Sequence, residues 1–194
     1  MERSLTFKTS IAAVIACFGT AAIAQVSPYA GQERHDIKSL SPQEVTALLA
    51  GQGAGFAKAA ELNGYPGPMH VIELADQLAL TPQQLQSTRQ LMHEHKERAR
   101  RLGAEVVAAE RALDQLFGER RADNASVASA AERIGSLQAR LRAEHLNTHL
   151  LQTAVLNTEQ ARRYTELRGY AADSTPSGHT PGPDSGSTHK RNTH

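Results

Sequence analysis

The sequence predicts an all-α fold in which short N-terminal helices pack on a long antiparallel helical hairpin. Apolar or small side chains recur every three or four residues from 85 to 116 and again from 127 to 155, which is the spacing of one helix face. Between these runs, residues 118 to 125 contain a glycine and two potential helix caps. Two long helices joined by so short a connection pack as antiparallel neighbours. Because the chain has only four Tyr, four Phe and no Trp, its core should be mainly aliphatic.

The first 24 residues have the pattern of a secretory signal peptide. Arg3 and Lys8 precede an apolar run that begins near Ile11, and the small-residue site Ala22-Ile23-Ala24 follows it. The only cysteine of the chain, Cys17, lies within this segment, so cleavage after Ala24 would leave no thiol for catalysis, disulfides or metal binding. The alternative is a lipoprotein anchored through Cys17, which the downstream small-residue site disfavours.

Three short helices are expected before the hairpin. The first follows a capping box at Ser41-Pro42-Gln43-Glu44, the second spans 56 to 62 and the third spans 69 to 78. A glycine-rich stretch at 51 to 55 and dense turn chemistry at 63 to 68 separate them.

The folded domain is predicted to span residues 25 to 170. Residues 171 to 194 are rich in Ser, Thr, Gly and Pro without periodicity, a composition typical of a disordered tail. Three histidines in this tail, His179, His189 and His194, could bind metal weakly.

The register of the hairpin can be predicted from its two apolar stripes, because antiparallel partners have residue numbers that add to a constant. The best register pairs Leu102 with Leu141 and His95 with Thr148. Large side chains then face small ones in several layers, as close packing prefers.

A five-residue motif occurs twice, as LTPQQ before the first long helix and as LNTEQ after the second. In each copy a Thr or Asn can cap a helix start, and a Gln three residues later can bond back to the cap. The helix-capping residues are Thr81, Gln84, Asn157 and Gln160. The simplest interpretation is two ordinary capping boxes, placed side by side at the open end of the hairpin.

Because these twin motifs flank an exported helical hairpin, the chain resembles the Spy/CpxP family of periplasmic proteins. This family includes ZraP-like zinc-binding proteins and CnrX-like metal sensors. The likeness covers residues 80 to 170, and the second motif departs from LTxxQ at Asn157. The run from Tyr29 through ELNGYPGP is also similar to a proteobacterial group of periplasmic heavy-metal sensors. The resemblance implies a four-helix protomer in a periplasmic homodimer. Its partners would be metal ions, unfolded periplasmic proteins or the periplasmic part of a membrane sensor.

Four of the nine histidines fall in the hairpin. His145 and His149 are four residues apart and share a helix face, and the register places His95 level with Thr148 between them. Imidazole and thioether ligands suit zinc, nickel, cobalt or copper better than calcium or magnesium. The candidate metal ligands are His95, His145, His149 and Met92, with Glu144 as an alternative to Met92. The competing interpretation is that His145 and His149 are solvated beside the seam and that His95 fills a polar layer.

Arginines crowd the part of the hairpin near its turn. By the family resemblance they could hold unfolded clients, although acidic neighbours make an ordinary solvated surface an equal alternative. The candidate client-binding residues are Arg98, Arg101, Arg133 and Arg140.

The charge balance and the absence of known catalytic motifs reduce the number of functions to be considered. Of 21 basic and 20 acidic residues, two basic and one acidic precede residue 25, so 19 of each remain and no nucleic-acid footprint is expected. No nucleotide-binding loop, HExxH or GxSxG motif occurs, so neither an enzyme nor a nucleotide cofactor is expected. The hypotheses are a stress protein that holds clients, a metal-responsive sensor or modulator, and a structural helical adaptor with neither activity.

Overall fold

The computed structural model of the protein describes residues 27–170. The predicted signal peptide with Cys17, and the predicted disordered tail, lie outside these residues. A single turn of 3-10 helix, η1, precedes six α-helices. Their bounds are η1 (Gln32–Arg34), α1 (Pro42–Leu49), α2 (Lys58–Glu61), α3 (Pro68–Glu73), α4 (Pro82–Gly118), α5 (Asn124–Val155) and α6 (Thr158–Leu167).

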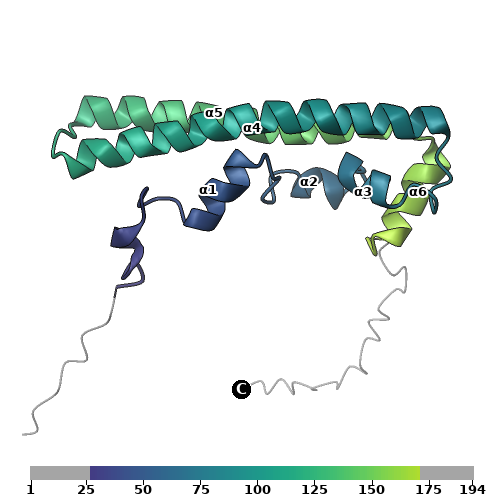
Figure 1. Cartoon of the computed structure of the whole chain (residues 1–194), viewed down its shortest axis with the longest axis horizontal. Helices are drawn as coiled ribbons and strands as arrows, with labels where there is room; N and C mark the ends of the chain where they lie inside the picture. The colour runs from purple at the N-terminus through teal and green to yellow at the C-terminus, as the bar shows by residue number, and fades with distance from the viewer. Residues whose placement is uncertain (1–26, 171–194) are drawn as a thin grey trace, which may run out of the picture.

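The all-α fold class is confirmed. Figure 1 shows α4 and α5 as one long antiparallel layer, with α1, α2, α3 and α6 lying along one side of it. There are six α-helices where the family resemblance implied four, because glycine-rich and proline-rich connections divide the segment before α4 into three short helices. No helix of the described chain is both long enough and apolar enough to cross a membrane.

Both long helices of the hairpin begin directly after a residue that caps the helix N-terminus. Asp123 caps α5 through its side chain, which accepts the backbone N–H of Ser126 at 2.7 Å. Arg120, in the connection, adopts a left-handed backbone conformation with φ 55°. An aliphatic cluster between the turn and the hairpin centre forms the main core. It includes Ala99, Val106, Ala109, Ile134, Leu137 and Leu141.

The predicted pairing of α4 and α5 is observed at the centre of the hairpin. Toward the open end, α5 buries a different face from the one predicted. Thr148 Oγ1 lies 2.9 Å from His95 Nδ1, as predicted. Beyond this point the expected apolar stripe is wrong, because Leu151 is 54% exposed while Gln152 is fully buried. Gln152 donates from Nε2 to Thr88 Oγ1 at 3.2 Å. The buried face of α5 turns here because α2 and α3 also pack against it.

The short helices pack closely on the hairpin. A Cβ built on Gly103 of α4 would lie 2.1 Å from the carbonyl oxygen of Leu48, so α1 crosses α4 at a point where only glycine fits. Near the open end, Val71, Leu78 and Tyr164 form a second core with Leu156. The helices α2 and α3 are shorter than predicted, since turns replace helix after Glu73.

The two copies of the repeated motif form reciprocal capping boxes and also bond to each other. Thr81 and Asn157 hold the N-cap positions, and each accepts the backbone N–H of the glutamine three residues later. In addition, Gln84 Nε2 donates to Gln160 Oε1 at 2.8 Å, and Gln160 Nε2 lies 3.1 Å from Gln84 Oε1. The starts of α4 and α6 are thereby joined across the open end.

Candidate metal pocket

A cavity of about 680 Å³ lies between the hairpin and the segment that runs from the end of α1 to α3. One wall comes from α4 and α5, and the other from the glycine-rich connection and the α2–α3 turn. All four candidate metal ligands line it. These are Met92, His95, His145 and His149.

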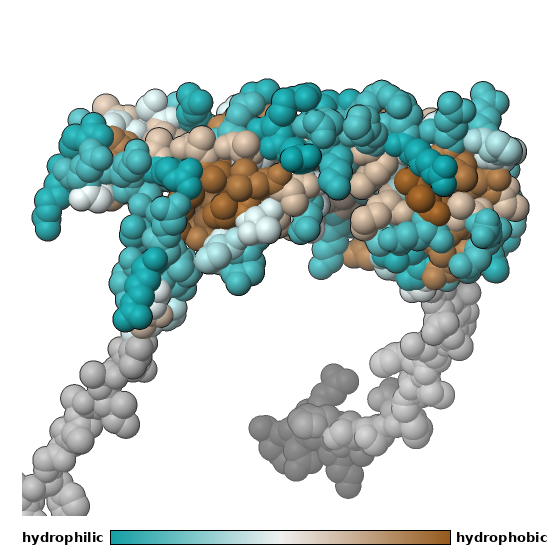
Figure 2. All heavy atoms as spheres, viewed as in Figure 1, coloured by the Kyte–Doolittle hydropathy of each residue, from teal (hydrophilic) through white to brown (hydrophobic). Residues whose placement is uncertain are grey.

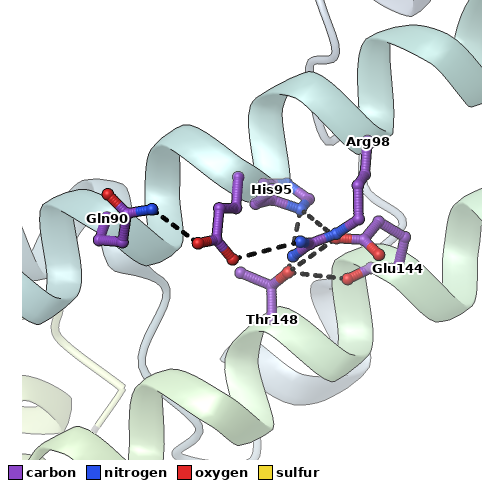
Figure 3. A network of polar contacts seen from close by, with 6 residues as sticks. Gln90, His95, Arg98, Glu144 and Thr148 are labelled. Atoms are coloured by element: carbon purple, nitrogen blue, oxygen red, sulfur yellow. Dashed lines mark hydrogen bonds and ion pairs between the residues drawn. The ribbon is translucent and has the colours of Figure 1, made fainter.

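His95 is buried in α4 and is held by two acceptors on α5. Its Nδ1 lies 3.2 Å from Glu144 Oε1 and 2.9 Å from Thr148 Oγ1 (Figure 3). The Thr148 hydroxyl donates its own hydrogen to the Glu144 carbonyl oxygen at 2.9 Å, so its lone pair faces the imidazole. Nδ1 of His95 is therefore the protonated nitrogen, and Nε2 carries the lone pair that a metal ion requires.

Glu144 orients His95 and is itself anchored. Arg98 Nε donates to Glu144 Oε1 at 2.9 Å, and Arg98 also reaches Glu94, which accepts from Gln90 (Figure 3). Because Oε1 of Glu144 is engaged by both His95 and Arg98, this carboxylate holds the imidazole in one orientation.

His145 is buried against His95 and Phe56. The His95 and His145 rings meet edge to face with centroids 4.6 Å apart, and the Phe56 ring stacks on His145 at 5.7 Å. Burial and then the neighbouring His95 lower the pKa of His145 to about 4, so the ring is neutral at ordinary pH. Its Nε2 is buried and has no hydrogen-bond partner among the described residues. The interpretation of His145 as a solvated flanking residue is therefore wrong.

His149 lies one turn further along α5 and faces the α2–α3 turn. Its Nδ1 donates to the Tyr65 carbonyl oxygen at 2.7 Å, which leaves the lone pair on Nε2. Glu61 Oε2 lies 3.7 Å from the same Nδ1. A Cβ on Gly67 would come within 3.2 Å of Nε2, so glycine is needed for the turn to approach this ring.

The three imidazoles share one pocket, but only two of them are adjacent. His95 and His145 are in contact, whereas His149 makes its contacts with the turn. Within residues 27–170, no group of three or more His, Cys, Asp or Glu side chains is placed to hold a metal ion. His95 and His145 are therefore the two candidate ligands that the structure brings into contact.

The model of one known protein family matches more than half of the chain. Residues 45–163 match the family model described as heavy-metal resistance. The chain belongs to the heavy-metal resistance family. This family includes the Spy/CpxP-like LTxxQ proteins, so the resemblance deduced from the twin motifs is confirmed. No curated protein and no solved structure matched the chain.

The candidate client-binding arginines of this heavy-metal resistance protein differ in the contacts that they make. Arg98 belongs to the network around Glu144, and Arg140 lies 3.9 Å from Glu105. Arg101 and Arg133 are exposed and form no ion pair with another described residue.

Sequence reasoning missed the wall of the pocket that faces the hairpin. Phe56, Glu61, Tyr65 and Gly67 contact the histidines, yet the short helix and the turns predicted for this region did not indicate where they pack on the hairpin. The one available signal was the ELNGYPGP run, which contains three of the four.

Proposed function

We propose that this protein is a non-catalytic, periplasmic, metal-responsive member of the heavy-metal resistance family that binds a transition-metal ion in the pocket beside α4 and α5. The ion would be zinc, nickel, cobalt or copper, and no nucleotide or nucleic acid takes part. The observation that carries this proposal is the adjacent, buried pair of His95 and His145.

The chemistry of the pair supports metal binding. A buried nitrogen without a hydrogen-bond partner, such as Nε2 of His145, costs roughly 1–3 kcal/mol of stability. A metal ion would satisfy this lone pair together with that of His95. The ring of His95 is already oriented by Glu144 and Thr148, and metal-binding imidazoles usually donate their other N–H to such oxygen acceptors.

The pocket also has a physical link to the surface of the protein, which supports a sensing role. Glu61 lies beside His149 and accepts a hydrogen bond from the Tyr164 hydroxyl of α6 at 2.6 Å. Ion binding that moves the α2–α3 turn would therefore alter the position of α6. We propose that this change is presented to the periplasmic part of a membrane sensor by a homodimer.

Calorimetric titration with zinc, cobalt, nickel and copper tests the proposal. All proteins would carry alanine at the tail positions His179, His189 and His194, so that the tail contributes no binding. We expect about one ion per protomer, and the His95→Ala/His145→Ala variant should bind at least about tenfold more weakly.

The matched control for this titration is His93→Ala. His93 is exposed on α4, two residues from His95, and does not line the pocket. Its replacement should leave the affinity unchanged. Equal affinity in the starting protein and the double variant would contradict metal binding in the pocket.

A second candidate function, holding of unfolded periplasmic proteins, is favoured by apolar side chains on the side of the short helices. Figure 2 shows apolar surface near α1 and again near α3 and α6. The large hydrophobic residues that are exposed between residues 49 and 69 are Leu49, Leu62, Tyr65 and Met69.

Suppression of aggregation of an unrelated unfolded protein, in the absence of metal, tests this function. The basic contributors would be Arg101 and Arg133, so Arg101→Glu/Arg133→Glu should weaken suppression. Failure to suppress aggregation would exclude the client-holding function, and failure of the metal titration as well would leave the structural adaptor.

A further inference from the structure

We propose that the ion for which this pocket is built is monovalent copper, held by His95, His145 and the thioether of Met92. The inference rests on the proposed function, since it uses the same pocket, and it goes further by naming the charge and softness of the ion. Three independent features of the pocket support it.

The first feature is the kind of donor that lines the cavity. Both methionines of the described residues line this pocket, but Met69 is half exposed and only Met92 lies on α4 with His95. Met92 precedes His95 by three residues, so the two side chains lie on the same face of α4. Thioethers bind soft ions such as monovalent copper, whereas zinc sites use thiolate, imidazole and carboxylate.

The second feature is the number of donors. Zinc sites have tetrahedral coordination and at least three protein ligands from His, Cys, Asp or Glu. The described residues offer no group of three such side chains, only the contacting pair of His95 and His145. Monovalent copper is stable with two or three neutral ligands, so the histidine pair with one thioether is a sufficient set.

The third feature is charge. The carboxylates near the histidines are already paired, Glu144 with Arg98 at 2.9 Å and Glu61 with Arg168 at 3.3 Å. Lys58 and Lys96 also line the cavity and add positive charge. Each of these two carboxylates therefore already has a cationic partner, which reduces the negative charge available to a divalent ion. The desolvation cost of an ion rises with the square of its charge, so a monovalent ion incurs about one quarter of the cost.

Competition with the copper(I) chelator bicinchoninate, under anaerobic reducing conditions, measures the affinity. The tail histidines are again replaced by alanine. We expect copper(I) to bind at least about a hundredfold more tightly than zinc or cobalt. Met92→Leu keeps the size of the side chain and removes the sulfur. It should weaken copper(I) binding at least about tenfold and leave zinc binding within about twofold.

Three further measurements complete the test. Met69→Leu is the matched control, since Met69 is 49% exposed at the cavity rim and should change copper(I) affinity by less than about threefold. X-ray absorption at the copper edge should detect a sulfur ligand that disappears in Met92→Leu. Circular dichroism of each variant verifies that the helices are intact.

The outcomes separate this inference from the proposed function. If a divalent ion binds in a His95- and His145-dependent manner and copper(I) binds no more tightly, the copper assignment is overturned and the metal pocket stands. An unchanged copper(I) affinity in Met92→Leu overturns the thioether ligand and with it the inference. If no ion depends on the two histidines, both proposals fall.

Discussion

At the scale of single residues, the histidines of the pocket differ in how they are prepared for a ligand. His95 and His149 each use Nδ1 to donate to an oxygen, which leaves Nε2 as the available nitrogen. His145 has no such partner at Nε2 and is kept neutral by burial. The sequence could predict that these residues lie near one another, but their tautomers and charges depend on neighbours that it could not place.

Glu144 should act on metal binding through His95. In Glu144→Gln the carboxylate charge that holds the Nδ1 proton of His95 is lost, so we expect metal affinity to fall about tenfold to a hundredfold. Isothermal titration measures this change. Glu105→Gln is the control, because Glu105 forms only an exposed ion pair with Arg140 at 3.9 Å and should leave affinity unaltered.

His145 should make the stability of the metal-free protein depend on pH. Its pKa is about 4 in the folded protein and about 6.5 when unfolded, so between these values the unfolded chain binds more protons. The stability that neutral His145 contributes is fully present above pH 6.5. As the pH falls toward 4, the free energy of unfolding decreases by at most about 3 kcal/mol. Burial also lowers the pKa of His95, which acts in the same direction.

Urea unfolding at pH 7 and pH 4.5 measures this effect. His145→Leu should lose less stability between the two pH values than the unmodified protein, because the titrating group is removed. His93→Ala, with an exposed ring replaced, should show the unmodified pH dependence. A His145→Leu variant that loses as much stability as the unmodified protein would contradict the assignment.

At the scale of the elements, long helices were predictable and short ones only partly. The periodicity from 85 to 155 and the capping residues fixed α4 and α5 and their central register. The seam near the open end was not predictable, because α5 faces both α4 and the short helices and therefore buries Gln152 in place of Leu151. The connection between α1 and α2 has no periodicity from which its contact with His145 could be deduced.

The crossing of α1 and α4 should depend on one glycine. Gly103→Ala would place a Cβ 2.1 Å from the Leu48 carbonyl oxygen, so α1 must move and we expect a loss of about 1–3 kcal/mol. Gly135→Ala is the matched control on α5, since nothing lies within 4 Å of its added Cβ. The control should stabilise by up to about 1 kcal/mol. Urea unfolding of both variants measures these changes. A higher urea midpoint than that of the unmodified protein in both variants would contradict close packing at Gly103.

At the scale of the whole molecule, the hairpin is held at both ends by different means. The turn end has an ordinary capping box at Asp123. The open end joins α4 to α6 through the side chains of Gln84 and Gln160, which also reach carbonyl oxygens at Val155 and Leu78. The twin motif predicted two helix starts side by side. Their mutual hydrogen bonds required the three-dimensional positions of both.

A double-mutant cycle should detect this connection. Gln84→Ala and Gln160→Ala remove the same pair of hydrogen bonds, so their effects on unfolding free energy should be non-additive by about 0.5–3 kcal/mol. Gln84→Ala combined with Asp123→Ala is the control, because these caps lie at opposite ends of the hairpin and should be additive within about 0.5 kcal/mol. Additive effects in the glutamine pair would show that the two caps act independently.

The bond between Gln84 and Gln160 has a consequence for how the protein is made. Gln84 lies in the first turn of α4. Gln160 lies in the first turn of α6, near the end of the described chain. A chain that ends between α5 and residue 160 keeps both helices of the hairpin but lacks Gln160, so its open end cannot be fastened. Premature stop codons and proteolytic cuts just upstream of α6 should therefore yield fragments in which the start of α4 is frayed and open to proteolysis.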